Sequence, residues 1–168
     1  MEIILGIGGN RGDRLSNLEK ARIKISERIG EITSYSRVIE SEPWGFSSEN
    51  WFLNQVLVVE SSLSPDMMLR ECLELEASMG RKRTKVYTDR TIDIDILFFG
   101  DRIINSESLV IPHPRLHERL FVLMPLAELR PGLSHPVFGI TVSDLLFACK
   151  DSTKTRWYKT DHSTVLLP

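Results

Sequence analysis

The segment Thr91–Phe99 constrains the fold more than any other part of the chain, because isoleucine and aspartate alternate along it from Ile92 to Ile96. Successive side chains of a β-strand point to opposite faces, so Asp93 and Asp95 share one face and the isoleucines share the other. The isoleucine face needs a hydrophobic core against it. Two like charges about 6.5–7 Å apart on one strand, among apolar neighbours, are costly unless a cation lies between them. The segment therefore predicts a buried strand with a candidate cation site on one face.

The two aspartates have no Cys or His beside them in sequence, and hard oxygen ligands favour Mg²⁺ or Mn²⁺ over zinc. On this strand alone, a solvated sheet face with two incidental acids is an equally good interpretation. The preceding segment, Arg81–Arg90, carries five Lys and Arg residues and leads directly into the acidic strand. A charge run by itself is typical of a solvated loop. Cations beside a carboxylate pair are instead typical of a metal–polyphosphate site, and we expect this loop to be mobile until such a ligand binds.

Strand and helix signals alternate along the first hundred residues in the order β-α-β-β-α-β. The expected strands are Glu2–Gly8, Ile32–Glu40, Trp51–Glu60 and Thr91–Phe99. One expected helix is capped by Asp13 and closed by Gly30. The other begins at Ser64-Pro65-Asp66 and closes at Gly80, with Cys72 on its apolar face. This order is that of a ferredoxin-like α+β sandwich, so we predict a four-stranded antiparallel sheet with helices on one side.

The last third of the chain is less regular. Phe121–Leu129 and Thr141–Lys150 indicate extra C-terminal helices, and residues 151–168 form a polar, aperiodic tail, part of which we expect to be mobile. The length of 168 residues suits one compact domain, so we assign residues 1–150 to a single catalytic domain.

Composition narrows the range of partners. The net charge of −2 argues against a nucleic-acid or polybasic membrane binder. The apolar run at the N-terminus is too short for a signal peptide or a membrane span, and the two cysteines suggest no disulfide framework. We expect a cytoplasmic, monomeric protein whose partners are small molecules.

Aromatic and amide residues mark a second candidate site, around Pro43-Trp44-Gly45 and Trp51–Asn54. Aromatic rings beside a planar amide suit a flat heterocycle, although a simple core-covering role is the better interpretation of Trp51. The glycines of Gly6–Asn10 lack the lysine of a phosphate loop and the spacing of a dinucleotide loop. We assign them to a tight strand-to-helix turn.

Six motifs over the first three-quarters of the chain occur together in one enzyme family. They are Gly8-Gly9-Asn10, Glu42-Pro43-Trp44-Gly45, Phe52-Leu53-Asn54, Glu76 with Gly80-Arg81, Arg90-Thr91-Ile92-Asp93-Ile94-Asp95-Ile96, and Pro112-His113-Pro114-Arg115. On these motifs the chain resembles the 6-hydroxymethyl-7,8-dihydropterin pyrophosphokinase family of folate biosynthesis. The resemblance implies transfer of diphosphate from ATP to the hydroxymethyl group of the pterin, with release of AMP.

The resemblance also implies roles for individual residues. Asp93 and Asp95 would hold two Mg²⁺ ions and, with Arg81 and Arg90, form the catalytic set. Residues implied on the nucleotide side are Glu76, Arg81, Arg83, Tyr87, Arg90, Ile96, Leu109, Val110, His113 and Arg119. Residues implied on the pterin side are the rings of Phe52 and Phe121, the edge-reading Asn54 and Ser41, and the backbone around Pro43 and Trp44.

Two departures from the family pattern stand out. Many members carry Trp-Gly-Pro-Arg before the acidic strand, where this chain has Tyr87-Thr88-Asp89-Arg90, so Asp89 adds a negative charge near the expected phosphates. Phe52 stands where tyrosine is frequent, which keeps the ring and loses a hydroxyl.

Two rival functions come from other classes of protein. A non-catalytic ferredoxin-like module for a small effector or RNA would leave Asp93 and Asp95 unexplained. A metal-dependent nuclease would use the carboxylates, but the charge of the chain is wrong for a long polyanion. Magnesium-dependent ATP binding would separate both from a pyrophosphokinase.

Overall fold

The computed structural model describes residues 1–81 and 88–159, and within them one antiparallel sheet carries the fold. Its strands are β1 (Glu2–Gly9), β2 (Glu31–Tyr35), β3 (Ile39–Ser41), β4 (Phe52–Glu60), β5 (Asp93–Phe99) and β8 (Thr155–Trp157). They follow the order β5-β1-β4-β3-β8, and β2 pairs with β4 beside β3. Strands β6 (Ile104–Asn105) and β7 (Val110–Ile111) form a separate ribbon. The predicted ferredoxin-like arrangement is confirmed, but the sheet has six strands within the described residues where four were predicted, because the expected second strand is split in two and β8 adds an edge strand.

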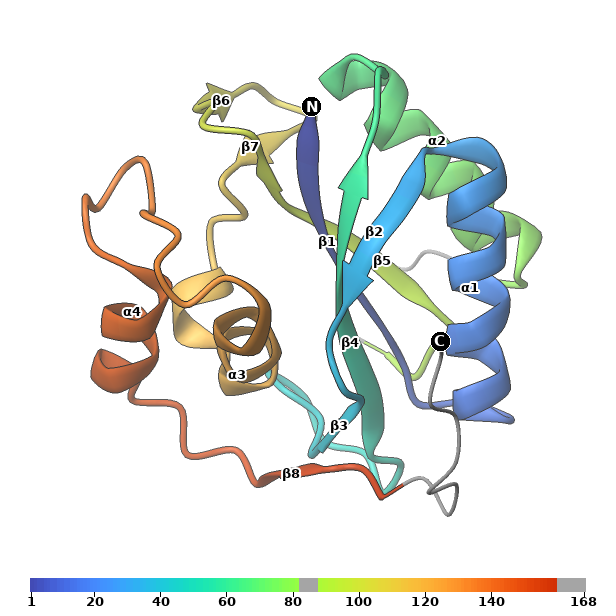
Figure 1. Cartoon of the computed structure of the whole chain (residues 1–168). Helices are drawn as coiled ribbons and strands as arrows, with labels where there is room; N and C mark the ends of the chain where they lie inside the picture. Colours follow the sequence, from blue (N-terminus) through green and yellow to red (C-terminus); the bar gives the residue numbers. More distant parts are fainter. Residues whose placement is uncertain (82–87, 160–168) are drawn as a thin grey trace, which may run out of the picture.

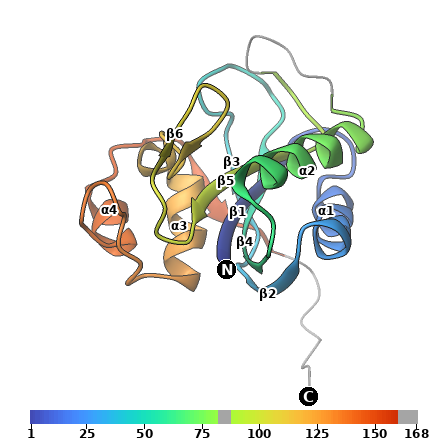
Figure 2. The ribbon, with the colours of Figure 1, turned by 90° about the horizontal axis from the view of Figure 1, so that it is seen from above.

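Helices cover both faces of the sheet, so the prediction of helices on one side is wrong (Figures 1 and 2). Helices α1 (Arg14–Arg28) and α2 (Pro65–Ser78) lie on one face. On the other face lie the short 3-10 turn η1 (Leu116–Glu118) and helix α3 (Leu120–Leu129), with α4 (Val142–Ala148) packed against α3. The reason is that the strands are apolar on both sides: Ile3 and Leu5 pack with α1 and α2, whereas Ile4 packs with α3. Burying both faces requires a third layer.

The helix ends follow local chemistry, as predicted. The side chain of Asp13 accepts a hydrogen bond from the backbone N–H of Ser16 at 3.0 Å, and Ser64 caps α2 in the same way. Gly80 takes the positive φ of 84° that ends α2. Cys72 is buried on the apolar face of α2. Among the helices described here, none combines the length and the hydrophobicity needed to cross a bilayer.

The expected second strand, Ile32–Glu40, is split into β2 and β3. Between them the side chain of Ser36 accepts a hydrogen bond from Val56 N–H at 3.0 Å, and Gln55 donates to the Ser36 carbonyl at 2.6 Å. The Ser36 N–H still donates to the Val56 carbonyl at 2.9 Å, but the Ser36 hydroxyl takes the Val56 N–H in place of a backbone carbonyl, so the regular ladder is interrupted before β3 continues along β4.

Strand β5 contains a β-bulge at Leu97, because Ile4 pairs with Phe98 while the next residue of β1, Leu5, pairs with Ile96. Up to Ile96 the alternation is regular, but the bulge turns both Leu97 and Phe98 toward the α3 side. The carbonyl of Leu97 accepts the backbone N–H of His113 at 2.9 Å. The bulge therefore holds the loop of His113 beside β5.

The C-terminal strand β8 lies in the segment to which the sequence pattern assigned no element. It pairs with β3, placing Arg156 opposite Glu40. The guanidinium of Arg156 donates two hydrogen bonds to Glu40 Oε2, at 2.8 and 2.6 Å, and Arg14 donates to Glu40 Oε1 at 2.9 Å. The edge of β3, which carries Ser41, is thus covered by the end of the chain.

Candidate active site

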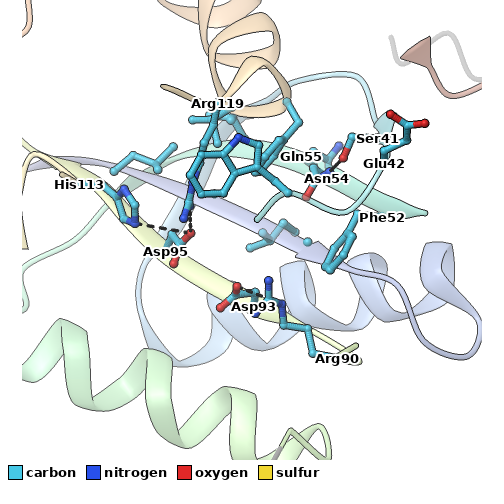
Figure 3. Close-up of a pocket in the computed structure, with 18 of the residues that line it drawn as sticks. Ser41, Glu42, Phe52, Asn54, Gln55, Arg90, Asp93, Asp95, His113 and Arg119 are labelled. Carbon is cyan, nitrogen blue, oxygen red and sulfur yellow. Dashed lines mark hydrogen bonds and ion pairs between the residues drawn. The ribbon is translucent and has the colours of Figure 1, made fainter. Parts of the chain in front are cut away.

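A cavity of about 200 Å³ lies on the α3 side of the sheet, over β1, β4 and β5 (Figure 3). It collects residues from segments that are far apart in sequence. The expected site residues that line it are Ser41, Trp44, Phe52, Asn54, Arg81, Arg90, Asp93, Asp95, His113, Arg119 and Phe121. The structure therefore brings the two candidate sites, acidic and aromatic, into one cavity.

Glycines of β1 form part of the cavity floor. Gly6 and Gly8 point to the same face as Asp95 and Asp93, with which they pair. A Cβ on Gly8 would lie 2.3 Å from Asn54 Oδ1, and a Cβ on Gly9 would lie 2.2 Å from the carbonyl oxygen of Thr91. The assignment of these glycines to a turn is wrong: they lie within the strand, and close approach of neighbouring groups is what requires them.

Asp93 lies at the arginine-rich end of the cavity. Its Oδ1 accepts a hydrogen bond from Arg81, whose guanidinium also binds the buried carboxylate of Glu76, and its Oδ2 lies 3.3 Å from Arg90 Nε. Burial works to raise the pKa of Asp93, but Arg90 and Arg81 outweigh it and hold that pKa below its ordinary value. Asp93 is therefore ionised at neutral pH.

Asp95 lies two residues further on, against Arg119 and His113. Its Oδ2 is 3.2 Å from Arg119 Nη1 and 3.9 Å from His113 Nε2 (Figure 3). Burial and the charge of Asp93 raise the pKa of Asp95 to about 7, in spite of Arg119. Burial and Arg119 lower the pKa of His113 to about 4, so its imidazole is neutral. The positive charge around the two carboxylates is thus not enough to keep Asp95 fully ionised at neutral pH.

This donor set fits a hard divalent cation. Two carboxylates share one strand face, and the raised pKa of Asp95 shows that additional positive charge would stabilise its ionised form. In residues 1–81 and 88–159, no three His, Cys, Asp or Glu side chains converge as a complete ligand set. Mg²⁺ is commonly held by one or two carboxylates, with water and substrate phosphates completing its octahedron.

The aromatic end of the cavity contains the amide expected to read an edge. Asn54 is nearly buried, and its Nδ2 donates to Ser41 Oγ at 3.0 Å. Phe52, from β4, and Phe121, from α3, both line the cavity. The ring of Trp44 faces the guanidinium groups of Arg115 and Arg119, at 4.2 and 4.9 Å.

Some expected residues lie outside the cavity lining. Glu76 binds the lining residue Arg81, and it also accepts the backbone N–H of Ile94 at 2.8 Å. Ile96 and Leu109 are buried in the core beside α2, and Val110 is exposed. Pro43 lies between the lining residues Glu42 and Trp44. Arg83, Tyr87 and most of the loop expected to be mobile fall outside the described residues.

Other lining residues were missed by sequence analysis. Gly6, Gly8 and Leu97 could have been found by extending the period-two rule, since each shares a strand face with a residue already singled out. Glu42 and Gln55 also line the cavity but carry no such signal, because Glu42 lies in the loop after β3 and Gln55 alternates to the face of β4 opposite Asn54, where its Oε1 accepts from Arg22 of α1.

Comparison with known proteins identifies the family. The family model for 7,8-dihydro-6-hydroxymethylpterin-pyrophosphokinase (HPPK) matches residues 4–131. A protein of Aquifex aeolicus, named 2-amino-4-hydroxy-6-hydroxymethyldihydropteridine pyrophosphokinase, is 41% identical over 136 residues, covering 81% of this chain and 84% of its own. A protein of the same name from Methylorubrum extorquens is 37% identical over 143 residues, covering 84% and 89%.

Solved structures agree in fold. A structure described as HPPK-DHPS in complex with substrates superposes with a TM-score of 0.70 at 15% identity, covering 88% of this chain and 43% of that one. Plasmodium falciparum HPPK-DHPS with pteroate gives a TM-score of 0.71 at 16% identity, covering 88% and 44%. This chain thus spans less than half of these solved chains, and the likeness concerns the fold of that part. With the match of the family model and the identities to the bacterial proteins, the chain belongs to the 7,8-dihydro-6-hydroxymethylpterin-pyrophosphokinase family.

Proposed function

We propose that this protein transfers the terminal diphosphate of ATP to the hydroxymethyl group of 6-hydroxymethyl-7,8-dihydropterin, releasing AMP, as a step of folate biosynthesis. One observation supports this most strongly. A single cavity contains a carboxylate pair flanked by arginines at one end and an aromatic slot with a buried amide at the other. The cavity therefore offers binding groups for a phosphate donor and for a flat acceptor.

At the phosphate end, Asp93 and Asp95 would hold Mg²⁺, with two ions expected. When bound there, Mg²⁺ would supply positive charge that offsets the charge of the phosphates. Arg81 and Arg90 now pair with Asp93, and Arg119 pairs with Asp95. These guanidinium groups are poised to exchange carboxylate oxygens for phosphate oxygens when substrate and metal enter.

At the other end, the pterin would stack between Phe52 and Phe121, with its polar edge on Asn54. The Ser41 hydroxyl accepts from Asn54 Nδ2 and so orients the amide. That contact leaves Asn54 Oδ1 to accept from a ligand N–H group.

The chemistry would be attack by the hydroxymethyl oxygen on the β-phosphorus of ATP, in line with departing AMP. Among the described lining residues, the neutral His113 faces Asp95, and the Glu42 carboxylate, near Ser41, is held by the backbone N–H and the ammonium group of Lys154. Such transfers depend chiefly on alignment and charge neutralisation, which the arginines and the fixed strand face supply.

The test is AMP release from ATP, with and without the pterin and with and without Mg²⁺. Pterin-dependent and magnesium-dependent AMP supports the proposal. Pterin-dependent ADP would make the protein a simple kinase on the same site, and no nucleotide product would favour a binding module. Calorimetric titration of Mg²⁺ in the presence of a non-hydrolysable ATP analogue measures the number of ions.

A further inference from the structure

Asp89 joins three segments that border the cavity. Its Oδ1 accepts a hydrogen bond from Asn10 Nδ2 at 2.7 Å, and its Oδ2 accepts one from Asn50 Nδ2 at 2.8 Å. Asn10 follows β1, Asn50 ends the loop between β3 and β4, and Asp89 itself precedes β5. One carboxylate therefore ties together the two strands and the loop that carry the opposite ends of the site.

Asn10 links this carboxylate to the backbone of Arg90. It is 4% exposed, and its Oδ1 accepts the Arg90 N–H at 2.8 Å while its own N–H donates to the Arg90 carbonyl at 2.9 Å. Its Nδ2 donates to Asp89 and also to the Asn50 carbonyl, at 3.1 Å. The amide of Asn10 is thus fully hydrogen-bonded, and its orientation depends on Asp89.

Arg90 is the residue held by these contacts, and it lies between the two ends of the cavity. Its Nε is 3.3 Å from Asp93 Oδ2, and its guanidinium lies 5.2 Å from the centre of the Phe52 ring. A shift of its backbone would move the guanidinium relative to both. Misplacement of such a group by about 1 Å can cost about a hundredfold in rate.

We propose that Asp89 is a positioning residue: through Asn10 and Asn50 it fixes Arg90 between Asp93 and the aromatic slot. This inference rests on the proposed function where it predicts an effect on turnover, whereas the hydrogen-bond geometry does not depend on that function. The extra negative charge of Asp89 thus has a structural role. The carboxylate is engaged by amides of the neighbouring segments.

The charge state of Asp89 agrees with this role. Burial works to raise its pKa, but hydrogen bonds from Asn50, Ser48 and Asn10 outweigh it, so the pKa of Asp89 lies below its ordinary value. The carboxylate is ionised at neutral pH and acts purely as an acceptor.

The experiment compares four variants with the wild type in two measurements, and the kinetic measurement adds Asp89→Ala in an Arg90→Ala background. Asp89→Ala removes both acceptors. Asp89→Asn keeps an oxygen for Asn10 and, with the amide of Asn50 rotated, can restore both contacts without the charge. Asn50→Ala removes one contact and is the milder variant should Asp89→Ala fold poorly. Asp101→Ala, at an exposed turn after the far end of β5, is the control.

The first measurement is steady-state kinetics of AMP release. We expect Asp89→Ala to lower kcat between about tenfold and a hundredfold, and Asp89→Asn to retain most of it. In an Arg90→Ala background, Asp89→Ala should add less than about a twofold effect, because both changes act through one group. Full additivity in that background would overturn the inference. So would a lower KM for ATP at unchanged kcat in both Asp89 variants, since that result would mean simple charge repulsion.

The second measurement is amide hydrogen exchange by NMR, which needs no turnover. We expect the Arg90 N–H to exchange at least about tenfold faster in Asp89→Ala and Asn50→Ala, and at the wild-type rate in Asp101→Ala. Unchanged Arg90 exchange in Asp89→Ala overturns the inference even if the enzyme is active. Faster exchange in a protein that releases no pterin-dependent AMP would support the positioning role while refuting the proposed function.

Discussion

Replacing Gly8 by alanine tests how the glycines of β1 shape the aromatic end of the cavity, where we propose that the pterin binds. The added Cβ would lie 2.3 Å from Asn54 Oδ1, whereas carbon–oxygen contacts settle at about 3.3–3.6 Å. The amide oxygen must therefore retreat by about 1 Å, which turns the Asn54 side chain away from Ser41.

The magnitude follows from two costs. An off-rotamer side chain costs about 0.5–1.5 kcal/mol, and loss of the Asn54–Ser41 hydrogen bond costs about 1 kcal/mol. Together these costs reach about 1.5–2.5 kcal/mol, and they raise the free energy of the complex in which Asn54 would contact the pterin. At 1.4 kcal/mol per decade, pterin affinity should fall between about tenfold and sixtyfold.

The assay is calorimetric titration of the pterin into Gly8→Ala in the presence of a non-hydrolysable ATP analogue. Gly132→Ala is the matched control, because nothing lies within 4 Å of a Cβ there. Thermal unfolding of both variants separates a local change from loss of the fold. A pterin Kd within twofold of wild type, in a Gly8→Ala protein of normal stability, would refute the link between Gly8, Asn54 and the slot.

Three further predictions concern the metal end and the C-terminal strand. Asp93→Asn should abolish magnesium-dependent AMP release in a protein that still folds, and near-normal turnover would remove Asp93 from the metal site. Arg156→Ala should lower the free energy of unfolding by about 1 kcal/mol in urea titrations, a small loss because Arg156 is largely exposed and Glu40 keeps Arg14. Burial works to raise the pKa of Glu40, but Arg156 and Arg14 hold it below its ordinary value of 4.5, so Glu40 adds stability above that pH and loses it as pH falls through the lowered pKa. The stability difference between wild type and Glu40→Gln should therefore shrink below about pH 4.5, and a difference that grows with acidity would contradict the assignment.

Local patterns predicted much of the fold. The alternation around Asp93 and Asp95 placed both carboxylates on one strand face, and the caps at Asp13 and Ser64 marked the two helix starts. Each depends on residues within a few positions of one another, so short windows of sequence contain the information.

Long-range pairing was beyond such patterns. Nothing near residues 155–157 announces a strand, because β8 exists through its ladder with β3, more than a hundred residues away. The helices on the second face of the sheet were not predicted for a similar reason. An apolar run such as β1 is equally compatible with a sheet covered on one face or on both. The partners of Asp89 lie 79 and 39 residues away, so its role could not be derived from its neighbours.

The bulge at Leu97 bears on which changes of length β5 can absorb. Loss of Leu97 would leave a regular strand in which the aspartates, Phe98 and Phe99 keep the faces they have now, at the expense of one buried leucine and the contact to His113. Deletion of Ile94 would instead turn every side chain on one side of the deletion to the opposite face of the sheet. Either the Asp93 carboxylate would then face the core or the phenylalanines would leave it. Leu97 is thus a position at which the deletion of one residue would weaken the contact between β5 and the His113 loop but leave the pairing of the sheet in place.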